Sequence, residues 1–127
     1  MNAPSVEALL EIDREYRDKA KAGVLRTIAP RRMNPGGNAW LPVLHTRHGL
    51  WQFSALFSNT ELAHELHRTH DWVVVYFSHA SGEEGQSTIV TERRGSLTGL
   101  RVVRGREPEC ARYYASLLVP TENAVRA

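Results

Sequence analysis

The sequence has a single cysteine among its 127 residues, which excludes an internal disulfide. It also lacks an apolar run of the length that spans a bilayer. Acidic residues occupy the first turns, where a secretory signal would need positive charge and a long apolar stretch. A lone cysteine fits a reducing compartment. We therefore predict a cytoplasmic protein that makes no contact with membranes.

Acidic residues are missing from two stretches of the chain. No Asp or Glu occurs from Lys19 to Thr60 or from Arg93 to Arg106, although both stretches contain several cations. Fourteen of the sixteen cations are Arg, whose planar guanidinium suits two-point contacts with phosphate or carboxylate. This segregation predicts a basic surface. The alternative is a solvated face whose charges form internal ion pairs.

The chain length and composition predict one globular domain over residues 1–127, with a frayed tail at about 121–127. The chain is long enough to bury a core without disulfides or metal, and 42% of its residues are hydrophobic and 24% charged, as in ordinary soluble proteins. The sequence contains no internal repeat.

The predicted fold is organised around the stretch from Leu50 to Phe77. Apolar residues alternate with polar ones up to Phe57, which predicts a strand with one buried face. The continuous apolar run from Trp72 to Phe77 predicts a second strand that is covered on both faces. With a helix between them, the two strands predict a right-handed βαβ unit if they are parallel neighbours.

The helix between these strands is predicted from its capping signal. Ser58 and Glu61 have the spacing of a capping box, in which each side chain satisfies an orphan amide of the first turn. Leu62 and Leu66 lie four residues apart and predict the buried stripe of the helix, with Ala63 beside them.

The remaining segments predict helices at both ends and further strands. A first helix is expected from Ser5 to about Ala22 with its stop at Gly23, and a last helix is expected to begin near Pro108. Additional strands are expected at 24–28, 41–46, 86–92 and 100–104. The prediction is an α+β domain: a mixed four- to six-stranded sheet with N-terminal, central and C-terminal helices packed on it.

Histidines recur every third residue at His64, His67 and His70. A zinc-protease helix instead needs two histidines four residues apart, and three histidines at this spacing point in different directions around one helix. A metal-dependent hydrolase or nuclease remains an alternative, with His64, His67 and Asp71 as candidate ligands and Glu92 as a further carboxylate. No catalytic residue and no cofactor is predicted in the preferred interpretation.

The preferred site is a set of arginines with aromatic residues between them in the sequence. Arginine neutralises phosphates, and exposed aromatic rings stack on bases. The predicted nucleic-acid-binding residues are Arg31, Arg32, Arg47, Arg93, Arg94, Arg101, Arg104 and Arg106.

Five segments together resemble an uncharacterised microbial domain family that can accompany helix-hairpin-helix DNA-repair proteins. The segments are IAPRRMNP, AWLPVLHT, FSALFSNTELAHEL, HDWVVVYF and RVVRGRE, and the resemblance covers roughly residues 8–115. It implies an association with DNA and brings no catalytic residue. The chain itself has no recognisable helix-hairpin-helix segment.

Three functions follow from these patterns. The preferred one is a non-catalytic accessory module that binds DNA or RNA, or a DNA-repair protein, through Arg-rich loops. The second is the metal-dependent hydrolase or nuclease. The third is a protein-interaction or homodimer module, in which an exposed edge strand at 41–46 or 100–104 pairs across a two-fold axis.

Overall fold

The chain folds into one antiparallel sheet with helices, and the computed structural model describes residues 3–118. The elements follow in the order α1 (Val6–Ala22), β1 (Arg26–Ile28), β2 (Leu41–His48), β3 (Trp51–Phe57), α2 (Glu61–Glu65), β4 (Val73–His79), β5 (Glu84–Thr91), η1 (Gly95–Leu97), β6 (Arg101–Val103) and α3 (Glu107–Leu118). The predicted α+β class is therefore confirmed. The frayed tail predicted at 121–127 lies outside the described residues.

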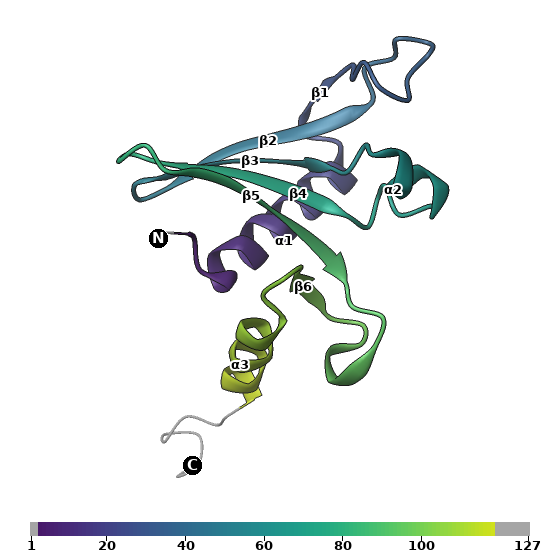
Figure 1. Ribbon diagram of the computed structural model, residues 1–127. Coiled ribbons are helices and arrows are strands. Elements are labelled where there is room, and N and C mark those ends of the chain that lie inside the picture. The colour runs from purple at the N-terminus through teal and green to yellow at the C-terminus, as the bar shows by residue number, and fades with distance from the viewer. Residues whose placement is uncertain (1–2, 119–127) are drawn as a thin grey trace.

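The six strands lie side by side in their order along the chain, and each described pairing is antiparallel. Figure 1 shows α1 crossing one face of this twisted sheet, with α3 beside β6 and α2 at one end of β3 and β4. The sheet is thus antiparallel where a mixed sheet was expected. Within residues 3–118, no helix is both long and apolar enough to cross a membrane.

The predicted parallel βαβ unit is wrong, because β3 and β4 form a wide hairpin. Trp51 lies opposite His79 and Phe57 opposite Val73, which is an antiparallel register. Beyond this pair, the amide of Ser58 donates to the Trp72 carbonyl at 2.7 Å. This hydrogen bond joins the two ends of the segment that connects β3 to β4. The connection contains only a five-residue helix and returns the chain beside β3 without crossing the sheet.

The details of α2 also differ from the prediction. Its N-cap is Thr60, whose hydroxyl accepts a hydrogen bond from the Ala63 amide at 3.1 Å, so the expected Ser58–Glu61 capping box does not form. Ala63 is the buried residue of this helix, whereas Leu62 and Leu66 are exposed. The helix is too short for two leucines four residues apart to form a buried stripe.

The local signals of α1 are confirmed. Ser5 caps its start by accepting from the Ala8 amide, and Gly23 ends it in the left-handed conformation at φ 70°. One side of the helix buries Leu9, Ile12 and Tyr16 against the sheet. Burying each such apolar side chain stabilises the fold by about 1.5–3 kcal/mol.

Tyr16 joins α1 to a point where the sheet splits. The β2–β3 pairing ends at Val43 opposite Leu56. Beyond this pair, the hydroxyl of Tyr16 lies between the backbones of Pro42 and Phe57. It donates to the Pro42 carbonyl at 2.7 Å and accepts from the Phe57 amide at 2.9 Å. Burial raises the pKa of this phenol, and the hydrogen bond from Phe57 partly opposes the rise. Helix and sheet are therefore fixed to each other by a polar contact inside the core.

We predict that Tyr16→Phe lowers the free energy of unfolding by about 1–3 kcal/mol, because a buried amide and a carbonyl both lose their partner. Urea denaturation measures this change. Tyr113→Phe is the matched control, since the Tyr113 ring also packs against the core and its hydroxyl has no hydrogen bond within the described residues. Equal stability of the two variants would contradict the role given to Tyr16.

Candidate functional site

The sheet face opposite α1 is open to solvent. Directly opposed residues of antiparallel strands share a face, so the register places two rows of side chains there. The rows are His45, Ser54, Tyr76 and Gln86, and Arg47, Gln52, Ser78 and Glu84. We call this surface the open face. Tyr76 is 47% exposed, which corrects the prediction that its strand is covered on both faces.

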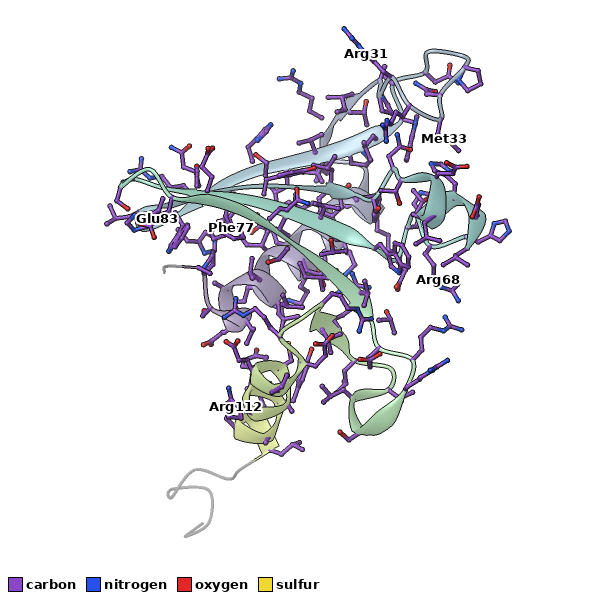
Figure 2. The ribbon with its side chains drawn as sticks, in the orientation of Figure 1. Arg31, Met33, Arg68, Phe77, Glu83 and Arg112 are labelled. Atoms are coloured by element: carbon purple, nitrogen blue, oxygen red, sulfur yellow. The ribbon has the colours of Figure 1, made fainter. Side chains whose placement is uncertain are left out.

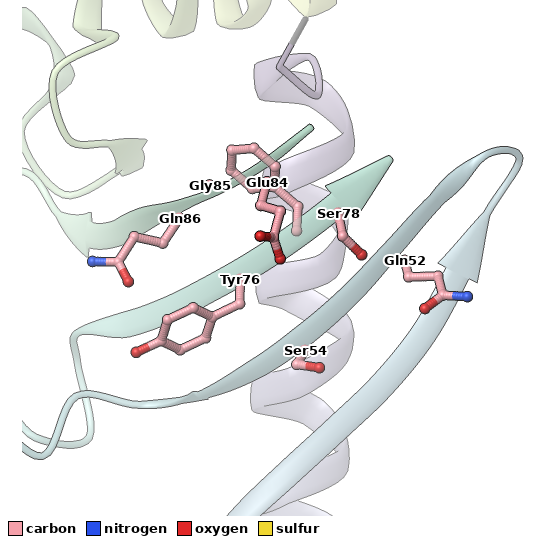
Figure 3. A pocket seen from close by; sticks show the side chains of 8 residues that line it. Gln52, Ser54, Tyr76, Ser78, Glu84, Gly85 and Gln86 are labelled. Atoms are coloured by element: carbon pink, nitrogen blue, oxygen red, sulfur yellow. The ribbon is translucent and has the colours of Figure 1, made fainter. Parts of the chain in front are cut away.

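Polar side chains line a shallow hollow on the open face, which we call the polar hollow. Its volume is about 430 Å³, and its lining includes Gln52, Ser54, Tyr76, Ser78, Glu84 and Gln86. Figure 3 shows these side chains on the near side of the strands, with α1 passing behind the sheet. Amide and hydroxyl groups in this arrangement offer both donors and acceptors around an aromatic ring.

A second hollow adjoins the first toward α2, and we call it the apolar hollow. Its volume is about 470 Å³, and it shares Tyr76 and Gln86 with the polar hollow. Its further lining includes Leu62, Trp72, Val74, Thr88 and Arg104. The exposed Leu62 of α2 therefore forms a wall of a surface cavity instead of the buried stripe expected from the sequence.

Arg101 is a structural residue and lies apart from the exposed arginines. Its side chain is 13% exposed, and its Nη2 atom pairs with Asp13 at 2.7 Å while Nη1 pairs with Asp71 at 3.0 Å. Asp13 is fully buried in α1, and its other partner is Arg17 on the next turn. The guanidinium thus connects α1, the start of β4 and β6.

Asp71 forms the outer part of the same network. Its carboxylate accepts from the Thr91 hydroxyl at 2.6 Å and from the Thr91 amide at 3.1 Å. Burial works to raise the pKa of Asp71, but these hydrogen bonds and the charge of Arg101 outweigh burial and hold the pKa below its usual value. The ionised carboxylate is therefore the form that the fold stabilises.

The other arginines of the predicted set fall into two groups. Arg104 pairs with Glu107 at 2.9 Å and Glu92 at 3.4 Å, and Arg106 pairs with Glu109 at 2.6 Å. The predicted arginines whose side chains form no ion pair within residues 3–118 are Arg31, Arg32, Arg47, Arg93 and Arg94.

These five arginines occupy three places. Arg47 lies on the open face in the row of Gln52, and Arg93 and Arg94 follow the end of β5. Figure 2 shows Arg31 on the long loop between β1 and β2, far from Arg112 on α3. The loop is joined to the start of the α2 segment, since the side-chain amide of Asn59 donates from Nδ2 to the Arg32 carbonyl at 2.9 Å.

The metal-ligand candidates do not converge. His64 and His67 line a separate hollow of about 390 Å³ with Trp40, and the His64 ring contacts the Asn59 side-chain oxygen at 2.6 Å. Asp71 is engaged by Thr91 and Arg101 instead. Across the described part of the chain, no group of three or more His, Cys, Asp or Glu side chains could hold a metal ion.

The edge strands proposed for dimer formation differ in their accessibility. In β6, the Val103 amide donates to the Cys110 sulfur and the Tyr114 hydroxyl donates to the Arg101 carbonyl, so α3 covers that edge. In β2, residues 41–43 pair with β1, and the rest of the strand lies beyond this pairing.

Sequence reasoning missed the open face and therefore missed Tyr76, Gln52 and Gln86. The signal was present, because Tyr76 and Ser78 alternate with the buried Val75 and Phe77.

Comparison of the chain with models of known families, with curated proteins and with solved structures gave no match. The resemblance to a domain family that accompanies DNA-repair proteins stays a prediction.

We predict that Arg101→Ala lowers the free energy of unfolding by about 3–5 kcal/mol, because it leaves the buried Asp13 carboxylate without its main partner. Arg93→Ala, at an exposed position, should change stability by less than about 0.5 kcal/mol. Urea denaturation of both variants measures the difference. An Arg101→Ala protein as stable as Arg93→Ala would show that the network does not hold the fold together.

Proposed function

We propose that this protein is a non-catalytic module that binds single-stranded nucleic acid across the open face. The observation that carries the proposal is the exposed ring of Tyr76 in the middle of a polar sheet surface. A flat aromatic ring with solvent on one side is a platform on which a base can stack. A duplex hides the faces of its bases, so the ligand that matches this platform is single-stranded.

Side chains around Tyr76 supply the polar contacts. Gln52 and Gln86 each carry a donor and an acceptor group, and Ser54 and Ser78 add hydroxyls. Such groups hydrogen-bond the edges of unpaired bases. The hollow offers a stacking surface and hydrogen-bonding groups together, which favours nucleic acid over a purely anionic small molecule.

Arginines without ion pairs supply the phosphate contacts. Arg47 lies on the open face at one side, and Arg93 and Arg94 follow β5 at the other side. Because these side chains form no ion pair within the described residues, their positive charges can neutralise phosphates of a strand that runs over β3, β4 and β5. The acid-free stretches of the sequence support this arrangement, as does the resemblance to a family associated with DNA repair. The lone cysteine agrees with a cytoplasmic location.

We predict that Tyr76→Ala weakens binding of a single-stranded oligonucleotide about five- to 150-fold, which corresponds to the loss of one stacked base, about 1–3 kcal/mol. Tyr76→Phe should bind nearly as well as the unaltered protein, since it keeps the ring. Fluorescence anisotropy with labelled DNA and RNA measures both affinities. If the two variants bind equally, Tyr76 is not a stacking platform.

We also predict that affinity falls steeply with salt and that the free arginines set the slope. Each phosphate contact contributes about 0.7 to the slope of log affinity against log salt for single strands. The double variant Arg93→Ala/Arg94→Ala should therefore have a shallower slope, by about 1.4. Arg112→Ala on α3 is the control and should leave the slope unchanged. A slope that does not change in the double variant would exclude these arginines from the interface.

A further inference from the structure

The apolar hollow is shaped by two register pairs and by α2. Tyr76 lies opposite Gln86 and Val74 lies opposite Thr88, so these four side chains form neighbouring rows of the same face. Leu62 from α2, Trp72 and Val90 complete the apolar lining. The volume of about 470 Å³ falls within the range of about 300–1,000 Å³ typical of small-molecule sites.

The charges at the rim of this hollow exclude a phosphate as its occupant. Arg104 is the cation of the lining, and its Nη1 atom is engaged by the carboxylates of Glu107 and Glu92. Two carboxylates beside one guanidinium leave a local charge that is not positive. The occupant that fits is a neutral, flat group with a polar edge.

Several hydrogen-bonding atoms in the hollow remain available to such a group. Within residues 3–118, the side chains of Gln86 and Thr88 have no hydrogen-bond partner, and the Nε and Nη2 atoms of Arg104 likewise have none. The Arg104 amide donates to the Thr88 carbonyl at 2.9 Å, which fixes Arg104 beside the hollow. The two carboxylates hold its guanidinium in place.

We propose that the apolar hollow binds one base of the nucleic-acid strand and that guanine is preferred. This inference rests on the proposed function and specifies the ligand of the same face. A guanidinium with two free donors matches the O6 and N7 acceptors of guanine, the commonest arginine–base contact. The base lies against Leu62, Trp72 and Val74, and its polar edge faces Gln86 and Arg104.

The test is binding of short thymidine oligonucleotides that carry one central guanine, adenine, cytosine or thymine. The guanine oligonucleotide should bind about tenfold more tightly than the others, as expected for a bidentate contact. Replacing the guanine by 7-deazaguanine, which lacks the N7 acceptor, should remove most of this preference. Fluorescence anisotropy at one fixed salt concentration measures all affinities.

Arg104→Lys tests the residue that carries the preference. Lysine keeps the charge beside Glu107 and Glu92 but lacks the planar pair of donors, so this variant should bind the guanine oligonucleotide no more tightly than the thymidine one. Arg106→Lys is the matched control, because Arg106 is also ion-paired but is not part of the lining. Thermal melting of both variants checks that each is folded.

The outcomes separate the two proposals. Failure of the unaltered protein to bind any oligonucleotide would overturn the proposed function and this inference with it. Equal binding of all four oligonucleotides, or a guanine preference that Arg104→Lys retains, would overturn the base pocket and leave the proposed function standing.

Discussion

One long helix has to cover the six-stranded sheet, and this constraint determines what the rest of the molecule presents to solvent. α1 buries the apolar side chains of one face, among them Phe53, Ala55 and Val75. The other face keeps a polar character because alternate residues of the same strands point there. The open face is therefore the side of the sheet opposite α1, and it is the broad polar surface on which Tyr76 lies.

Two polar ties hold the helix on the sheet. Tyr16 bridges the carbonyl of Pro42 and the amide of Phe57, and one turn earlier on the helix Asp13 pairs with Arg101, which also pairs with Asp71. Both contacts involve polar or charged groups in the interior, and loss of one partner would leave the other without a hydrogen bond or a counter-charge and destabilise the fold. The contacts therefore fix the position of the helix as well as contributing to stability. The second contact also separates Arg101 from the other predicted arginines, since a guanidinium that neutralises a buried carboxylate is not available to a ligand.

The sequence predicted features that depend on neighbouring residues. Ser5 and Gly23 mark the ends of α1 through local hydrogen bonds and backbone conformation, and the alternation of apolar and polar residues up to Phe57 predicted β3. The prediction of a βαβ unit was wrong because helix length and strand direction depend on the whole sheet. The hydrogen bond from Ser58 to Trp72 instead closes an antiparallel hairpin of β3 and β4. Arg101 was grouped with the surface arginines because its partners Asp13 and Asp71 are distant in sequence.

The site was predicted only in part for the same reason. The five predicted arginines without an ion pair lie in acid-free stretches, which composition reveals, but the face they accompany depends on the strand order. An apolar run such as 72–77 indicates a strand without saying which of its faces is covered. The alternation of Tyr76 and Ser78 with Val75 and Phe77 is a short signal for the exposed face, and the position of α1 on the opposite side confirms it.

The most direct test of this account is to follow the backbone amide resonances of the protein as a single-stranded oligonucleotide is added. We expect shifts at Gln52, Tyr76 and Gln86 on the open face, with the amides of the buried side of α1 nearly unchanged. Shifts confined to α1 and α3, or no shifts at low salt, would contradict the claim that the open face binds nucleic acid.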